Sequence, residues 1–161
     1  MIAHLPMYVN IVFILTTLLT VFLFYKAGSR SKINLGILGL WLLLQAVLSY
    51  VGFYTVTNTT PPRFVLLALP AVLLIIFLFI TAKGRVYLNN LDAKTLTLLH
   101  VVRIPVELCL YWLFLHKSIP QLMTFEGRNF DILAGLTAPI IFYLGYVNNK
   151  LGKTVLLLWN F

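Results

Sequence analysis

Ionisable side chains recur at helical spacing within one long apolar stretch of the chain. They are His100, Arg103 and Glu107, with Tyr111 one turn further on. At about 100° per residue, the four side chains lie within an arc of about 80° on one helix face. Arg103 and Glu107 stand four residues apart, a spacing at which opposite charges pair directly. The stripe is therefore a candidate intramembrane site for a proton, an ion or an anionic group. A self-neutralising pair that only locks helix packing is the alternative.

A second apolar stretch carries uncharged polar side chains. Gln45 and Ser49 stand one turn apart in the stretch from 33 to 56. Polar and small residues commonly join helices within a membrane. Two interpretations stay open: the two side chains hold helices together, or they line the same cavity as Arg103 and Glu107.

Charged residues alternate with large apolar ones after the fourth apolar stretch. Glu126, Arg128 and Asp131 stand there beside Phe125 and Phe130. Asp131 is placed to cap the next helix. The three charged residues form a candidate outer-loop site, either as a lid over the cavity or as a partner-binding surface. An ordinary interfacial connection is the alternative, with the two phenylalanines dipping into lipid.

The sequence offers no motif for a metal or a cofactor. Cys109 is the only cysteine, so neither an internal disulfide nor a cysteine-based zinc or iron–sulfur site is expected. No glycine-rich phosphate loop, zinc-protease motif or serine-hydrolase motif occurs. We therefore predict no catalytic residue, no metal and no cofactor.

Long apolar helices must position these residues. Of the 161 residues, 61% are hydrophobic and 10% are charged, whereas a soluble domain has about 25% charged residues. A helix that crosses a membrane needs about 20 mostly apolar residues. Five stretches approach this length: 7–25, 33–56, 64–82, 96–115 and 132–147. A sixth run, 154–161, is too short to cross. We predict an all-α, polytopic transmembrane helix bundle with five spans and a truncated or partial sixth, in a single domain over residues 1–161.

The distribution of basic residues predicts an orientation. The first, third and fifth loops hold Lys26, Arg30, Lys32, Lys83, Arg85, Lys94, Lys150 and Lys153. The second and fourth loops hold Arg63, Lys117 and Arg128. Because cytoplasmic loops collect Lys and Arg, we expect the N-terminus outside. The net charge of +8 then reflects topology and contact with the lipid bilayer. Binding to nucleic acid would need a basic face on a soluble module.

Two segments resemble a family of small, uncharacterised bacterial integral membrane proteins. They run from His100 to Glu107 (HVVRIPVE) and from Thr124 to Gly135 (TFEGRNFDILAG). The resemblance covers the fourth and fifth predicted spans and implies a bacterial inner (cytoplasmic) membrane. It also implies that similar chains continue beyond Asn160 through further spans, so we expect this sequence to be a fragment. It implies no activity and no catalytic residue.

Three classes of function are consistent with these features. The first is a permease-like or proton- or ion-handling protein with a polar intramembrane cavity for a small solute or a proton. The second is a non-catalytic accessory or assembly protein whose polar stripes only hold helices together. The third, less favoured, is a membrane enzyme that acts on a lipid. A water-filled cavity that reaches Glu107 would favour the first class, and a dry Arg103–Glu107 pair would favour the second.

Overall fold

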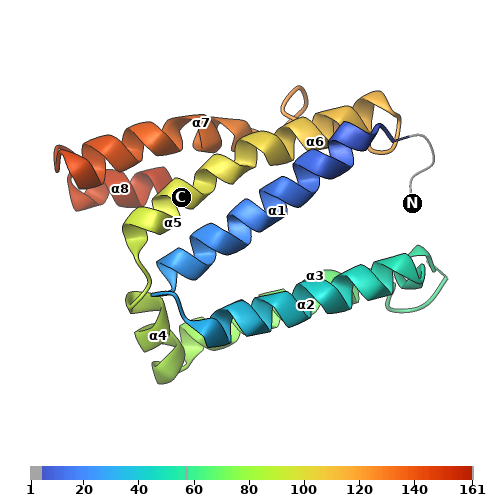
Figure 1. Ribbon diagram of the computed structural model, residues 1–161, viewed down its shortest axis with the longest axis horizontal. Helices are drawn as coiled ribbons and strands as arrows, with labels where there is room; N and C mark the ends of the chain where they lie inside the picture. The colour runs from blue at the N-terminus through green and yellow to red at the C-terminus, as the bar shows by residue number, and fades with distance from the viewer. Residues whose placement is uncertain (1–4, 57, 161) are drawn as a thin grey trace. The chain divides into compact units, whose positions relative to one another are not determined.

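Helices make up all the regular structure that the computed structural model describes (Figure 1). It describes residues 5–56 and 58–160. These residues divide into two compact units. One unit runs from Gly28 to Leu91, and the other joins the chain up to Ala27 to the chain from Asp92 onward. The all-helical class is confirmed, and the single domain over 1–161 stays a prediction.

The first unit contains α2 (Lys32–Tyr50), a short 3-10 turn and α3 (Val65–Ile80). The helix α2 begins after Ser31, whose hydroxyl oxygen accepts a hydrogen bond from the Asn34 backbone N–H (3.3 Å). It ends earlier than the predicted span 33–56, because Gly52 takes a left-handed conformation (φ 71°) that only glycine adopts without strain.

The same unit contains α4 (Ala82–Asn89), which leaves the end of α3 at an angle of 94°. Thr81 separates the two helices, and its side chain accepts a hydrogen bond from the Gly84 N–H (3.1 Å). A Cβ at Gly84 would lie 2.3 Å from the Leu78 carbonyl oxygen, so the bend requires glycine there. The predicted third loop therefore contains a helix.

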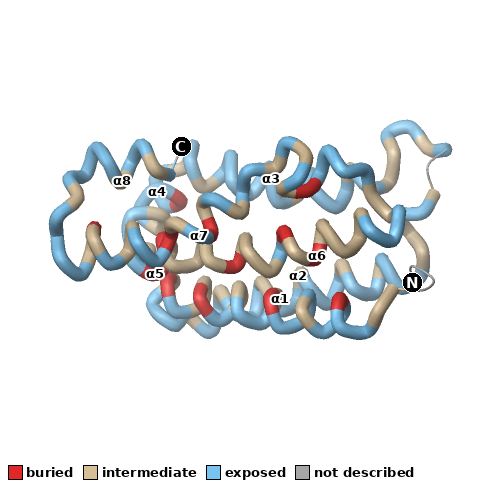
Figure 2. Tube along the Cα trace, turned by 90° about the horizontal axis from the view of Figure 1, so that it is seen from above, coloured by how far each residue is buried: buried red, intermediate tan, exposed pale blue. Residues whose placement is uncertain are grey.

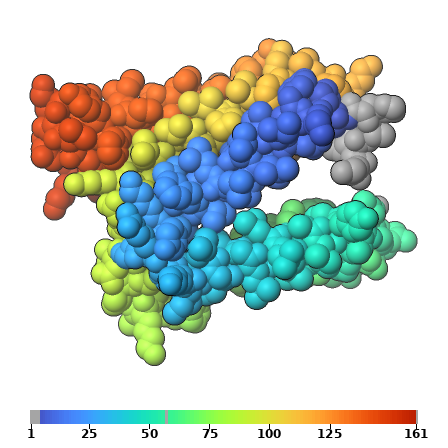
Figure 3. Space-filling model, viewed as in Figure 1, coloured from blue at the N-terminus to red at the C-terminus, as the bar shows by residue number. Residues whose placement is uncertain are grey.

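The second unit is built on two long helical stretches. Its elements are α1 (Met7–Ala27), α5 (Ala93–Leu99), a 3-10 turn (His100–Val102), α6 (Arg103–Leu115), a second 3-10 turn (Gln121–Met123), α7 (Asp131–Phe142), a π-helical turn (Tyr143–Val147) and α8 (Lys153–Asn160). The helices α1 and α7 both pack against α5, the 3-10 turn and α6 (Figures 1 and 3). Trp159 of α8 donates to the Thr137 hydroxyl of α7 (3.0 Å).

Three helical stretches in the described chain are long and apolar enough to cross a membrane: Met7–Ala27, Lys32–Tyr50 and Ala93–Leu115. A fourth is possible by length if the bent pair α3–α4 counts as one span. The stretch Asp131–Val147 is apolar but shorter. The predicted run 154–161 forms α8 up to Asn160, and its last residue lies outside the described residues. Five full spans and a partial sixth therefore stay a prediction.

Burial differs sharply between helices (Figure 2). Buried positions lie on α1, α4, α5, α6 and α7, whereas α2 and α3 have none. The exposed faces of α2 and α3 consist of large apolar side chains such as Leu40, Leu43 and Phe77. Water would make such faces unfavourable, whereas hydrocarbon solvates them well. The exposed apolar faces of α2 and α3 therefore fit helices that face lipid.

Candidate functional site

The start of α6 positions the two charged residues of the predicted stripe. Arg103 is the first residue of α6 and Glu107 lies one turn later. Pro105, in the first turn, has no N–H to donate to the Val101 carbonyl, and proline is tolerated at this position of a helix. The interrupted ladder explains why a 3-10 turn precedes α6.

Glu107 is sealed within the second unit. Only 1% of its surface is exposed, although a carboxyl group is among the groups least often buried. Its Oε1 accepts a hydrogen bond from Asn129 Nδ2 (2.5 Å). Its Oε2 is buried and has no hydrogen-bond partner in the described part of the chain. Glu107 is thus a buried carboxyl that an amide, and no cation, contacts.

Asn129 connects Glu107 to the start of α7. Its side-chain oxygen accepts from the Asp131 backbone N–H (3.3 Å), and its Nδ2 also lies 3.4 Å from the Met123 carbonyl oxygen. Its backbone N–H donates to the carbonyl of the fully buried Thr124 (3.3 Å). These bonds hold the Asn129 amide in place from three sides, which orients it toward Glu107.

Arg103 forms an ion pair with Asp131. The predicted Arg103–Glu107 pair is wrong, because Asp131 is brought to the side of α6 and the long arginine side chain reaches it instead. The expected capping role of Asp131 is also not found: Phe130 stands at the N-cap without a side-chain bond, and Asp131 is the first residue of α7. The Arg103 and Asp131 side chains are 37% and 53% exposed. The Arg103–Asp131 ion pair is therefore much more exposed than the buried carboxyl of Glu107.

The connection between α6 and α7 folds back along α6 (Figure 1). Phe125 packs against Tyr111, with ring centroids 5.1 Å apart. Asp131 then reaches Arg103, about 18 Å back along the helix from its end at Leu115. A Cβ at Gly127 would lie 2.3 Å from the Gln121 carbonyl oxygen, so this compact turn requires glycine. The structure thus brings part of the predicted outer-loop site to the predicted intramembrane site.

We name Arg103, Glu107, Asn129 and Asp131 the polar cluster. It joins the HVVRIPVE and TFEGRNFDILAG segments, which are distant in the sequence. Glu126 and Arg128 do not belong to it: both are exposed and form no ion pair or side-chain hydrogen bond within residues 5–56 and 58–160. Asn129 was missed because an uncharged side chain in a predicted loop gives no periodic signal.

His100 has neighbours of its own. Its ring packs edge-to-face on Trp159, with centroids 5.0 Å apart. Its Nδ1 is buried without a hydrogen-bond partner in the part of the chain that the structure describes. His100 thus links the 3-10 turn to α8, whereas Glu107 and Tyr111 contact the connection before α7 and Arg103 contacts the first residue of α7.

Gln45 and Ser49 belong to the first unit. The Tyr54 hydroxyl donates to Gln45 Oε1 (2.5 Å), and the Ser49 carbonyl accepts from the Gly52 N–H (3.1 Å). Both contacts stabilise the end of α2. That these two residues share a cavity with Arg103 and Glu107 stays a prediction.

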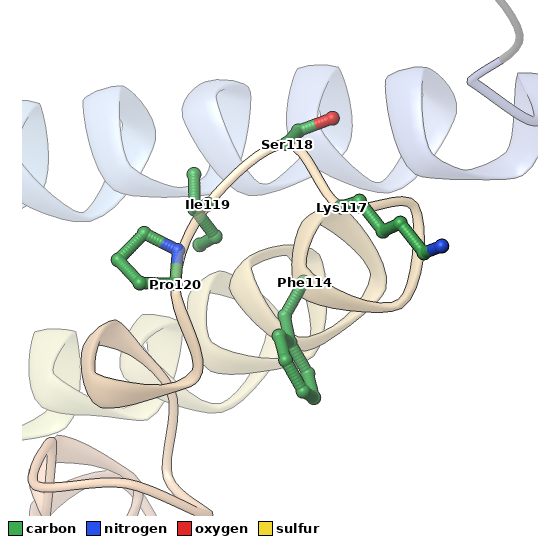
Figure 4. Close-up of a pocket in the computed structure, with 5 residues that line it drawn as sticks. All are labelled: Phe114, Lys117, Ser118, Ile119 and Pro120. Atoms are coloured by element: carbon green, nitrogen blue, oxygen red, sulfur yellow. The ribbon is translucent and has the colours of Figure 1, made fainter.

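A surface hollow in the second unit lies at the end of α6, apart from the polar cluster (Figure 4). It is lined by Phe114, Lys117, Ser118, Ile119 and Pro120. These residues form the turn that starts the connection to α7. Nowhere in the described residues do three His, Cys, Asp or Glu side chains gather as metal ligands. The buried carboxyl of Glu107 therefore remains the strongest chemical feature of this unit.

No protein-family model, no characterised protein and no solved structure matches the chain.

Proposed function

We propose that the chain is a multi-pass membrane protein that binds and releases a proton at Glu107. The observation that carries the proposal is the sealed carboxyl itself, 1% exposed, with an amide on one oxygen and no partner on the other. A charged carboxylate without a cation is costly in a low-dielectric place, whereas the neutral acid is tolerated. Ionisable groups inside membrane helices commonly form proton or ion pathways.

Arg103 provides the partner for the ionised state. It stands four residues before Glu107, at the spacing that permits direct pairing, and it now contacts Asp131. When Glu107 releases its proton, Arg103 moves from Asp131 toward the new carboxylate. Asp131 is half exposed and can then take up a proton or water contacts. Proton release from Glu107 would thus be coupled to an exchange of the Arg103–Asp131 ion pair for an Arg103–Glu107 ion pair.

The location follows from the sequence features. The imbalance of basic residues between loops supports an N-terminus outside and the basic loops in the cytoplasm. The resemblance of the HVVRIPVE and TFEGRNFDILAG segments supports the bacterial inner membrane. With the apolar helices of the structure, these features favour a multi-pass membrane protein.

A second candidate, the accessory or assembly role, rests on a different observation. The members of the polar cluster bond mainly to one another and fasten the connection to α6. In this case the cluster would be a packing device, and Glu107 would never exchange its proton.

Proton flux into proteoliposomes distinguishes the two candidates. Vesicles carry a pH-sensitive dye inside, and a potassium gradient with valinomycin drives the flux. We expect the wild-type protein to carry protons and Glu107→Gln to reduce the rate to that of protein-free vesicles. Glu126→Gln is the matched control, because it neutralises an exposed carboxyl outside the cluster. A wild-type rate equal to that of empty vesicles, or an unchanged rate in Glu107→Gln, would favour the packing role.

A further inference from the structure

A pocket with both polar and apolar lining residues lies in the first unit, where the first turn of α2 meets the last turn of α4. Asn34 on α2 donates a hydrogen bond to the Tyr87 hydroxyl on α4 (3.1 Å), which joins the two helices. Ser29, Ser31 and Asn90 also line the pocket. Its volume of about 350 Å³ is within the range of small-ligand sites.

Four side chains of this pocket have donor hydrogens to spare. Ser31 and Tyr87 accept hydrogen bonds through their oxygens, and neither donates its own hydroxyl proton to another described residue. The Ser29 hydroxyl and the Asn90 amide form no side-chain hydrogen bond among the residues described. Hydroxyls and amide N–H groups around one space suit an acceptor-rich anion such as a phosphate.

The charge around the pocket has the sign that attracts an anion. The sequence from Gly28 to Leu91 contains no Asp or Glu. Four cations, Arg30, Lys32, Lys83 and Arg85, lie in the two segments that form the pocket, and none pairs with a carboxylate within the described residues. Unneutralised Lys and Arg near a membrane attract anionic lipid.

The bend between α3 and α4 sets the depth of the pocket. If α3 crosses the membrane, α4, at 94° to it, lies along the membrane surface. The first residue of α2, another helix long and apolar enough to span, stands at the same place. If α2 and α3 both cross, the pocket would lie at the level of lipid headgroups, with apolar helices extending from it into the hydrocarbon.

We propose that this pocket binds the phosphate of an anionic phospholipid headgroup. The hydroxyls of Ser29, Ser31 and Tyr87 and the amide of Asn90 donate to the phosphate oxygens. The four cations raise the affinity for a headgroup with net negative charge. This site is independent of the proton proposed at Glu107, which lies in the other unit.

Thermal unfolding of the detergent-solubilised chain tests the proposal, with three probes titrated separately. Short-chain phosphatidylglycerol is expected to raise the unfolding temperature in a saturable way. Short-chain phosphatidylcholine, which is zwitterionic, and inorganic phosphate are expected to have little effect. Equal stabilisation by phosphatidylcholine would overturn the charge selectivity. Equal stabilisation by inorganic phosphate would overturn the assignment to a lipid.

Two double variants locate the site. Tyr87→Phe with Asn90→Ala removes two donors and is expected to weaken phosphatidylglycerol binding about tenfold. Lys32→Gln with Lys83→Gln leaves the Asn34–Tyr87 bond intact and is expected to weaken binding by a similar factor, so the test survives if the first variant does not fold. Lys150→Gln, an exposed cation of the other unit, is the control and should bind as the wild type. Unchanged binding in the lysine variant would overturn the proposal.

Discussion

Asn129 supports Glu107 more directly than any other described residue, because its amide contributes the hydrogen bond to the buried carboxyl. Asn129→Leu would leave both carboxyl oxygens without a partner. Loss of a buried hydrogen-bond partner lowers the free energy of unfolding by about 1–3 kcal/mol. We expect the detergent-solubilised Asn129→Leu variant to have a lower unfolding temperature than the wild type. Asn148→Leu, at an exposed asparagine, is the control. Equal stability of the two variants would show that the Asn129–Glu107 bond is absent.

Asp92 gives a prediction for the dependence of stability on pH. It caps α5, just before the apolar stretch, and hydrogen bonding from the Thr95 hydroxyl lowers the pKa of its carboxyl below the ordinary value of 3.8. A carboxyl with a lowered pKa stabilises the folded chain above its ordinary pKa, and this contribution is lost as the pH falls through the lowered value. The free energy of unfolding of the wild type should therefore exceed that of Asp92→Asn at neutral pH, and this difference should shrink on acidification. A difference that stays constant between about pH 6 and about pH 3 would contradict this.

Helical spacing predicted which charged residues share a face, and it failed to predict their partners. Arg103 and Glu107 are on one helix, so a count of 100° per residue relates them. Their actual partners, Asp131 and Asn129, come from a segment more than 20 residues further on. Periodicity within one helix contains no information about which distant loop folds against it.

The helices themselves were easier to predict than their ends and bends. Continuous apolar runs predicted α1 and the stretch Ala93–Leu115 to within a few residues, because burial of backbone polar groups in lipid demands a helix. The early end of α2 and the bend before α4 depend on Gly52 and Gly84, whose conformation and close contacts only three-dimensional structure reveals.

Gly135 determines how closely α7 approaches the 3-10 turn and α6. A Cβ there would lie 2.8 Å from Ile104 Cγ1 and 3.3 Å from the His100 carbonyl oxygen. Gly135→Val should therefore push α7 away and lower the free energy of unfolding by about 1–3 kcal/mol. Gly39→Ala is the control, since a Cβ at Gly39 meets no atom within 4 Å. Similar unfolding temperatures for the two variants would show that α7 does not pack here.

Charge is unevenly divided along the whole chain. All four acidic residues, Asp92, Glu107, Glu126 and Asp131, lie in the second unit, whereas the segment from Gly28 to Leu91 contains only basic ones. Composition alone, with 61% hydrophobic and 10% charged residues, predicted a membrane protein. Composition could not show that part of the outer-loop site packs against α6.

Cysteine labelling tests the predicted orientation of the whole molecule. In a Cys109→Ser background, Ser29→Cys and Asn89→Cys should react with a membrane-impermeant maleimide only after the membrane is opened, because the predicted orientation places both basic segments in the cytoplasm. Asn58→Cys, in the second loop, should react from outside. All three positions are exposed. Labelling of position 29 or 89 in intact cells would contradict the predicted orientation.

Infrared difference spectroscopy of Glu107 tests the proton site most directly. A protonated carboxyl absorbs through a carbonyl stretch that a carboxylate lacks. At neutral pH we predict this band in the wild type and in Glu126→Gln, its loss in Glu107→Gln, and its shift to higher frequency in Asn129→Leu, where the carbonyl oxygen loses its hydrogen bond. If the wild type shows no such band, or if the band persists in Glu107→Gln, then Glu107 is ionised and the account of a buried proton is wrong.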